Sequence, residues 1–240
     1  MSKHYLQHYQ CGADEFEAFI ALPDTNGPHP AVLIVHEWWG RNDYVIGRAK
    51  QLAEQGYVGV AVDMYGNGKT ADNPTEAQAL MESVINNPDN IVQRFDAAMT
   101  LLPEIGQADA HRVAAIGYCF GGAVVLNMAR AGKPLKAVCS FHGTLSPAFT
   151  MSADGFAGKI AVYNGADDPM VDADSIAAFK QEMQSAGVDY DFVNYPNTVH
   201  GFTNPLATAR GEKYGIPLRY SAEADADAWS KMLALLSAVF

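Results

Sequence analysis

The chain has 240 residues, enough for one large domain or two small ones with a sizeable buried core. Lys and Arg number 16 against 27 Asp and Glu, so the formal net charge is −11. This acidic balance argues against a nucleic-acid backbone or an anionic membrane surface as the main partner. Hydrophobic residues make up 49% and charged residues 18%, which is typical of a globular chain rather than a disordered one.

The sequence also lacks the segments that would direct it to a membrane. No apolar run approaches the roughly 20 residues that a spanning helix needs, and residues 1–8 contain no stretch of signal-peptide type. The cysteines Cys11, Cys119 and Cys139 are odd in number and lack metal-ligand spacing, so a disulfide framework is not expected. We expect a cytoplasmic protein without metal or cofactor, and we leave a homodimer open as its assembly.

Strand and helix patterns alternate along most of the chain. The β-branched apolar run at 31–35 is typical of a strand covered on both faces, and apolar residues at helical spacing over 43–55 are followed by Gly56. Predicted strands occupy 16–22, 31–35, 57–62, 112–116, 137–141, 159–163 and 190–195, and predicted helices occupy 43–55, 74–86, 89–102, 120–131, 174–186 and 222–239. This order predicts an α/β fold, a mostly parallel central sheet with helices on both faces, as a single domain over 1–240. The segment 203–220 reads as long and irregular, either a lid or a dimer contact.

A nucleophile motif lies between the predicted strand at 112–116 and the helix at 120–131. Cys119 has Gly117 and Gly121 two residues to either side, which is the G-x-C-x-G form of the nucleophile elbow. Glycine is needed there because the tight turn brings strand and helix close together, and the helix N-terminus favours a thiolate. The alternative is a small buried cysteine in a glycine-rich turn. Cys139, in an apolar strand, is expected in the core.

The acid and the base should follow the nucleophile in that order along the chain. Asp167 and Asp168 lie in a glycine turn after the strand at 159–163, and we choose Asp168 as the acid because it directly precedes Pro169 and the helix start. Asp167 is the alternative and is expected to face solvent; both could instead be capping residues. His200, in the loop after the last strand, is the predicted base. His142 precedes the acid, so we interpret it as a structural or pocket-lining residue.

These motifs resemble the dienelactone hydrolase family of α/β-hydrolases over essentially the full chain. The matching segments are 36–40 (His-Glu-Trp-Trp-Gly), 117–122 (Gly-Tyr-Cys-Phe-Gly-Gly), 165–168 (Gly-Ala-Asp-Asp) and 200–202 (His-Gly-Phe). The cysteine in the elbow is the specific part, since most α/β-hydrolases use serine there. The resemblance implies the α/β-hydrolase fold, with Cys119 as nucleophile, His200 as base and Asp168 as the acid that orients it.

The resemblance also implies roles for the segment after the strand at 31–35. Relatives carry a glutamate at the position of Glu37 that holds the resting nucleophile as an unreactive thiol until substrate displaces it, and like-charge repulsion makes this physically reasonable. One oxyanion-hole donor is expected from the backbone N–H of Phe120, just after the nucleophile. By resemblance, the second donor is the N–H of Trp38. The alternative for Glu37 is a solvated loop residue.

The expected substrate is a neutral or weakly charged ester or lactone with a good leaving group. Relatives that cleave dienelactone hold its carboxylate with arginines, and this chain has none over 74–82 or from Gly201 to Leu206. Aromatic residues of the motifs would line the pocket: Trp38, Trp39, Tyr65, Tyr118, Phe120 and Phe202. Three alternatives stay open: hydrolysis of neutral phosphotriesters with the same cysteine, a thiol-dependent acyltransferase, and a non-enzymatic scaffold that binds a ligand or senses redox state.

Overall fold

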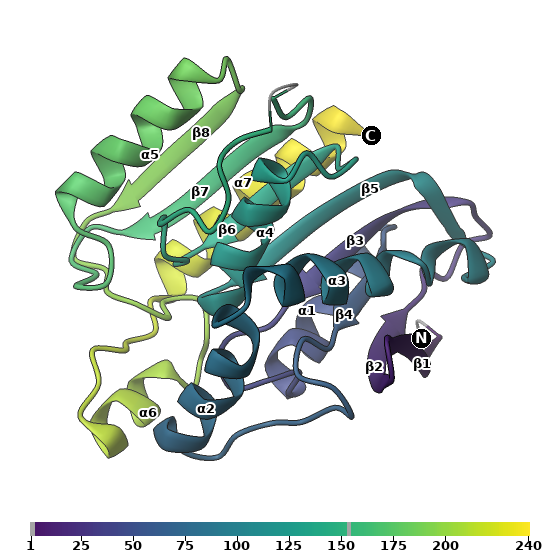
Figure 1. Ribbon diagram of the computed structural model, residues 1–240, viewed down its shortest axis with the longest axis horizontal. Helices are drawn as coiled ribbons and strands as arrows, with labels where there is room; N and C mark the ends of the chain where they lie inside the picture. Colours follow the sequence, from purple (N-terminus) through teal and green to yellow (C-terminus); the bar gives the residue numbers. More distant parts are fainter. Residues whose placement is uncertain (1–2, 153–154) are drawn as a thin grey trace. The chain divides into compact units, whose positions relative to one another are not determined.

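The computed structural model describes residues 3–152 and 155–240 (Figure 1). The contacts within the chain group it into two compact units, unit 1 at Met1–Ile116 and unit 2 at Gly117–Phe240. Among the described residues, no helix combines the length and apolar character needed to cross a bilayer. The prediction of one domain over 1–240 stays a prediction.

Unit 1 holds a mixed sheet with the strand order β1-β2-β4-β3-β5. Antiparallel pairing joins β1 to β2 and β2 to β4, whereas β3 and β4 run parallel. The strands are β1 (His4–Cys11), β2 (Asp14–Ala21), β3 (His29–Val35), β4 (Val58–Val62) and β5 (Ala108–Tyr118), the last of which reaches the start of unit 2. Every residue of β4 is buried, because helix α1 (Asp43–Glu54) packs closely on it. A Cβ on Gly59 would lie 2.4 Å from the Ala49 carbonyl oxygen, so only glycine permits this approach.

The remaining helices of unit 1 are α2 (Pro74–Ile85), α3 (Pro88–Met99) and the short 3₁₀ helix η1 (Leu102–Glu104). The side chains of Asn73 and Asn87 cap α2 and α3, and each cap is followed by proline at the first helical position. Such a start satisfies backbone N–H groups that have no partner inside the helix. The sequence predicted both helices to within three residues at either end.

Unit 2 holds three parallel strands, β6 (Ala137–Phe141), β7 (Lys159–Gly165) and β8 (Tyr190–Tyr195), in that order. Its helices are α4 (Phe120–Arg130), α5 (Ala173–Ser185), α6 (Ala207–Tyr214) and α7 (Ala222–Val239). Both α4 and α7 contact β6 (Figure 1), and α7 also reaches β7. The carboxyl ends of β6, β7 and β8 lead into the segments that carry His142, Asp168 and His200.

The predicted fold class is confirmed: a mixed sheet with helices on both faces, as in the α/β-hydrolase fold. Three elements were not predicted, and the short helix η1 is one of them. Strand β1 is mostly exposed and polar, and α6 lies inside the segment 203–220 that the sequence analysis described as irregular. Strand β5 also begins four residues before the predicted start at Arg112.

Candidate active site

Cys119 stands at a strained turn between β5 and α4. Its backbone has φ 54° and ψ −117°. Residues other than glycine rarely adopt this conformation outside functional sites. A Cβ on Gly117 would lie 2.0 Å from the Gly121 carbonyl oxygen, which explains the glycine requirement of the motif. The Cys119 N–H donates to the carbonyl of Phe141 at 3.0 Å and ties the turn to the end of β6. The sulfur is thus presented, half-buried, at the first turn of α4.

Asp168 and His200 form a buried hydrogen-bonded pair. His200 Nδ1 donates to Asp168 Oδ2 at 2.7 Å, and the two side chains are 3% and 0% exposed. The other carboxylate oxygen, Asp168 Oδ1, accepts the backbone N–H of Met170 at 2.9 Å, so both oxygens are held in place. Asp167, the alternative acid, is exposed. The pair has the geometry in which a carboxylate orients an imidazole and fixes its tautomer.

Backbone contacts hold the loops of the acid and the base together. Gly165 passes so close to the following loop that a Cβ there would lie 2.4 Å from the Thr198 carbonyl oxygen. The same carbonyl accepts the N–H of Asp167 at 2.9 Å. On the far side of the base, Arg219 N–H donates to the His200 carbonyl at 3.2 Å. The position of His200 relative to Asp168 is therefore set by main-chain contacts as well as by the side-chain hydrogen bond.

The electrostatics of His200 link it to the thiol. Burial by itself would lower the pKa of the imidazole. The negative charge of the Cys119 thiolate, hydrogen bonds to Asp168 and Cys119, and the charge of Asp168 outweigh it and raise this pKa to about 10. Because Nδ1 is occupied by Asp168, Nε2 is the ring nitrogen left for the thiol. The arrangement favours an imidazolium between two negative groups.

The aromatic residues of unit 2 that were predicted to line the pocket are buried in the packed interior. Tyr118 and Phe202 have no exposed surface, and Phe120 is 5% exposed. Tyr118 stacks on Phe141 at 4.8 Å between ring centroids, and Phe202 lies 5.4 Å from Tyr195. Their role as substrate contacts stays a prediction.

Unit 1 holds the other predicted residues on the segment after β3 and at the end of β4. Glu37 is 5% exposed, so it is not the solvated loop residue of the alternative interpretation. The rings of Trp38 and Trp39 meet edge to face at 4.9 Å, and Tyr65 donates its hydroxyl hydrogen to the Trp38 carbonyl at 3.0 Å. These contacts hold the peptide between Trp38 and Trp39 in one orientation.

His36 orders this segment of unit 1, and the sequence analysis gave it no role of its own. Its Nε2 accepts the N–H of Met64 at 3.2 Å, which requires that Nδ1 carry the proton; Nδ1 then donates to the Glu37 carbonyl at 2.6 Å. Burial lowers the pKa of His36 to about 4 and outweighs the opposing effects of the Glu37 carbonyl and Asp63. A histidine directly after an apolar strand was the sequence signal for such a contact.

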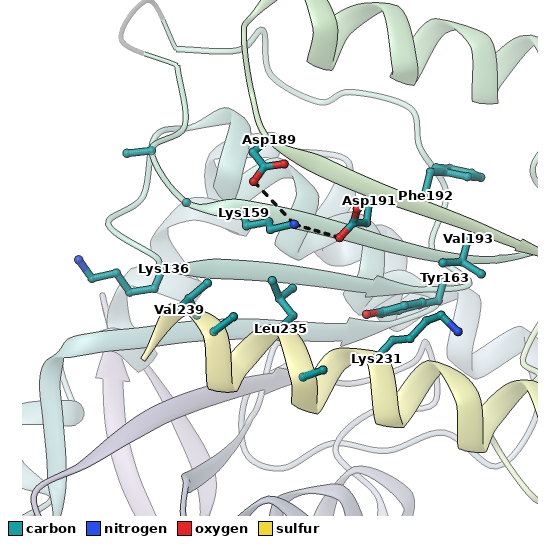
Figure 2. Close-up of a pocket in the computed structure, with 14 residues that line it drawn as sticks. Lys136, Lys159, Tyr163, Asp189, Asp191, Phe192, Val193, Lys231, Leu235 and Val239 are labelled. Carbon is teal, nitrogen blue, oxygen red and sulfur yellow. Dashed lines mark ion pairs between the residues drawn. The ribbon is translucent and has the colours of Figure 1, made fainter.

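Figure 2 shows a groove of about 890 Å³ in unit 2. It is lined by β7, β8 and α7, and Lys159 lies there between Asp189 at 3.7 Å and Asp191 at 3.1 Å. Neither Cys119, Asp168 nor His200 lines it. Its volume suits a small-molecule cavity.

The fold and the cysteine elbow place the chain among the α/β-hydrolases. The sequence model described as the dienelactone hydrolase family matches residues 16–240. The chain belongs to the dienelactone hydrolase family, and it is accordingly a hydrolase that acts on ester bonds. The resemblance seen in the sequence is confirmed, and the non-enzymatic alternative is set aside.

Individual relatives agree with this assignment. A protein of Methylorubrum extorquens named "Putative carboxymethylenebutenolidase" is 28% identical over 226 residues, which cover 90% of this chain and 74% of the relative. A protein of Aquifex pyrophilus named "Protein usf" is 30% identical, with 78% of this chain and 81% of the relative covered. A crystal structure of a dienelactone hydrolase-like promiscuous phosphotriesterase from metagenomic libraries is 33% identical, with a TM-score of 0.93 and 100% and 99% of the two chains covered.

Proposed function

We propose that this protein hydrolyses neutral activated esters or lactones through a covalent intermediate on Cys119. The observation that carries the proposal is the buried pairing of His200 with Asp168 at 2.7 Å. The charge of Cys119, which raises the pKa of His200, supports Cys119 as the partner of the imidazole. A strained elbow, a base and an orienting acid in this relation are the parts that nucleophilic acyl transfer needs. Metal or cofactor chemistry has no part in the proposal.

The reaction has two steps. The Cys119 thiolate attacks the carbonyl carbon, the bond to the leaving oxygen breaks, and the His200 imidazolium gives its proton to the departing alkoxide. Neutral His200 then takes a proton from water, the resulting hydroxide attacks the thioester, and the carbon–sulfur bond breaks to release the acid and restore the thiolate. Asp168 holds the imidazole in the tautomer that both steps use. Atoms and charge balance without a further reactant.

The oxyanion would be stabilised by backbone N–H groups, of which Phe120 at the start of α4 is the first. The N–H of Trp38 is the second donor in this proposal. Two carbonyl contacts support it: His36 holds the Glu37 carbonyl, which belongs to the same peptide as the Trp38 N–H, and Tyr65 holds the Trp38 carbonyl. A rigid peptide is what a preorganised donor requires.

Glu37 would hold Cys119 as a thiol before substrate binds, and displacement of the Glu37 carboxylate by substrate would free the thiolate that starts the reaction. Its burial is consistent with the idea, because a buried carboxylate is stabilised by hydrogen-bond donors, and a thiol is such a donor. In this proposal Glu37→Ala alters the pH profile of hydrolysis as well as its rate. Glu37→Gln keeps the shape of the side chain but removes its charge, so it separates the effect of the charge from that of the shape. A pH–rate profile of Glu37→Ala that matches the wild type would remove the gating role.

A neutral substrate is supported by the state of the arginines near the expected site segments. Arg41 pairs with Glu17, and Arg94 donates to the Met64 carbonyl at 2.7 Å. In unit 2, Arg219 donates to the Asn197 carbonyl at 2.8 Å. Each of these guanidinium groups already has a structural partner, and the net charge of −11 also disfavours an anionic substrate.

A second candidate activity is the hydrolysis of neutral phosphotriesters. The observation that favours it is the likeness to the promiscuous phosphotriesterase at a TM-score of 0.93. The same thiolate would attack phosphorus in place of carbon and expel a good leaving group. Release of p-nitrophenol from paraoxon by the wild type but not by Cys119→Ala would support this activity, and equal release by both would remove it.

A panel of p-nitrophenyl esters and lactones tests the main proposal. The wild type should release acid and p-nitrophenol from the esters and hydroxy acids from the lactones, and Cys119→Ser and His200→Ala should lose most activity. Added methanol separates hydrolysis from acyl transfer, because a transferase would convert the acyl group to the methyl ester in place of the free acid. Full activity in Cys119→Ala would contradict the proposal.

A further inference from the structure

The geometry of unit 2 points to His142 as a positioning residue that sets the tilt of the His200 imidazole toward Cys119. This inference rests on the proposed function, since it gives His142 a purpose only if His200 is the base. In the sequence analysis His142 had a structural or pocket-lining role, because its place in the chain order excluded it as the base. The structure shows which residues it touches.

The backbone at His142 is strained and anchored to the elbow. His142 has φ 40°, in the left-handed region, although it is neither glycine nor asparagine and is fully buried. Its N–H donates to the Tyr163 carbonyl at 2.8 Å, and the preceding residue, Phe141, accepts the N–H of Cys119. The chain at this point is therefore tied directly to the residue that carries the nucleophile.

The next residue brings this turn onto the helix of the nucleophile. A Cβ on Gly143 would lie 2.7 Å from the backbone carbon of Gly122 and 2.8 Å from the nitrogen of Ala123, both in the first turn of α4. Only a glycine allows this contact. The turn at 142–143 and the first turn of α4 thus form one rigid block, and His142 projects its side chain from that block.

The His142 imidazole contacts the loop of the base at three residues. Its Nε2 is hydrogen-bonded to the hydroxyl of Thr203 at 2.8 Å. Its ring meets the ring of His200 edge to face, with centroids 5.2 Å apart and planes at 67°, and meets Phe202 in the same way at 5.2 Å and 77°. One side chain therefore bridges the block of the nucleophile and the loop of the base.

This bridge supplies a constraint that Asp168 does not. A single hydrogen bond at Nδ1 leaves the His200 ring able to tilt about that bond, and tilt moves Nε2 away from the sulfur. An edge-to-face neighbour limits the tilt because the ring quadrupoles favour that arrangement over others. An error of about 1 Å in such a position costs as much as ~100-fold in rate. Retaining an imidazole in strained backbone is consistent with that benefit.

Variants of His142 and Thr203 separate this role from simple packing. His142→Asn accepts the left-handed backbone but cannot reach Thr203 or the His200 ring. His142→Phe keeps a ring against His200 and loses the hydrogen bond. Thr203→Val removes the hydroxyl that bonds His142, and Thr203→Ser keeps a hydroxyl at that position. Tyr195→Phe is the matched control, because it removes a buried hydroxyl beside Phe202 that bonds Asp227 at 2.7 Å and not His142.

The experiment measures kcat, KM and the melting temperature of these variants with a p-nitrophenyl ester. We expect kcat to fall about 10- to 100-fold in His142→Asn and about 3- to 10-fold in Thr203→Val, with KM within about twofold of the wild type. Thr203→Ser should recover kcat, and Tyr195→Phe should leave it unchanged. Alkylation of Cys119 by iodoacetamide at neutral pH should slow in parallel with kcat, which loss of packing alone would not produce in folded variants.

Two results would overturn the inference. One is wild-type kcat in both His142→Asn and Thr203→Val. The other is a loss of kcat in Thr203→Val that Thr203→Ser does not restore, or that Tyr195→Phe shows equally. Failure of the proposed function would look different, since Cys119→Ala would then retain activity whatever happens at His142.

Discussion

Two buried histidines, His36 in unit 1 and His200 in unit 2, have pKa values that are shifted in opposite directions. His36 in unit 1 is hydrogen-bonded to a backbone N–H and a backbone carbonyl, and burial lowers its pKa to about 4. His200 in unit 2 is equally buried, but Asp168 and the thiolate of Cys119 raise its pKa to about 10. Burial thus does not decide the protonation of an imidazole here; the charge of its partners does. A neutral His36 suits a fixed support, and a charged His200 suits proton transfer.

The strongest way to break this comparison is to remove the groups that set His200 apart. Cys119→Ala or His200→Ala should lower kcat/KM for a p-nitrophenyl ester by ~10⁴-fold, because each removes a group that acts in both steps. Steady-state hydrolysis measures this directly. Activity above a tenth of the wild type in the Cys119→Ala variant would mean that another residue performs the reaction.

A smaller effect is expected when only the orienting acid changes. Asp168→Asn keeps the shape of the side chain but removes its charge, and we expect kcat to fall by ~10³-fold as the imidazole loses its preferred tautomer. Asp167→Asn is the matched control on the neighbouring exposed residue and should stay within about twofold of the wild type. Equal losses in both variants would argue against Asp168 as the specific partner.

The titration of His200 tests, without any assay of activity, whether Cys119 raises the pKa of His200. Nuclear magnetic resonance of the imidazole should show an imidazolium that persists toward a pKa of about 10 in the wild type. In Cys119→Ala this pKa should move down, since the negative charge of the sulfur is gone. An unchanged titration in that variant would show that the thiol and the imidazole do not interact.

The smallest effect concerns His36 and the stability of the fold. Its pKa is about 4 in the folded chain and about 6.5 when unfolded, so the unfolded chain binds more protons between these values. The free energy of unfolding should therefore fall as pH drops from about 6.5 toward 4, by up to ~1.4 kcal/mol per pH unit from this group. His36→Gln, which can donate and accept the same hydrogen bonds, should lose this component in denaturant titrations. Identical pH dependence in both proteins would contradict it.

Much of the fold was predictable because the buried strands carry their signal in local sequence. The run of β4 is buried at every residue, and the helix starts at Asn73 and Asn87 have side-chain caps. Strand β1 gave no such signal, because its residues are mostly exposed and its pairing with β2 provides the structure. Helix α6 buries only Ala207 and Gly211, so an apolar periodicity was absent.

The residue types of the candidate site could be predicted from the sequence, but the contacts that hold them in place could not. The glycines around Cys119 and the chain order of Asp168 and His200 follow from local geometry and topology. The contacts of His142 with Thr203, and of His36 with Met64, join residues that are 61 and 28 positions apart. Such contacts depend on how loops meet after folding, and residue order alone does not encode them.

The most direct test of the central account is to trap the acyl group on the enzyme. The wild type should be mixed with a p-nitrophenyl ester, quenched in acid within the first turnover, digested and analysed by mass spectrometry. We predict an acyl thioester on the peptide that contains Cys119, formed at least as fast as the product acid appears. Rapid hydrolysis with no modified Cys119, or with the acyl group on another residue, would contradict covalent catalysis by this thiolate.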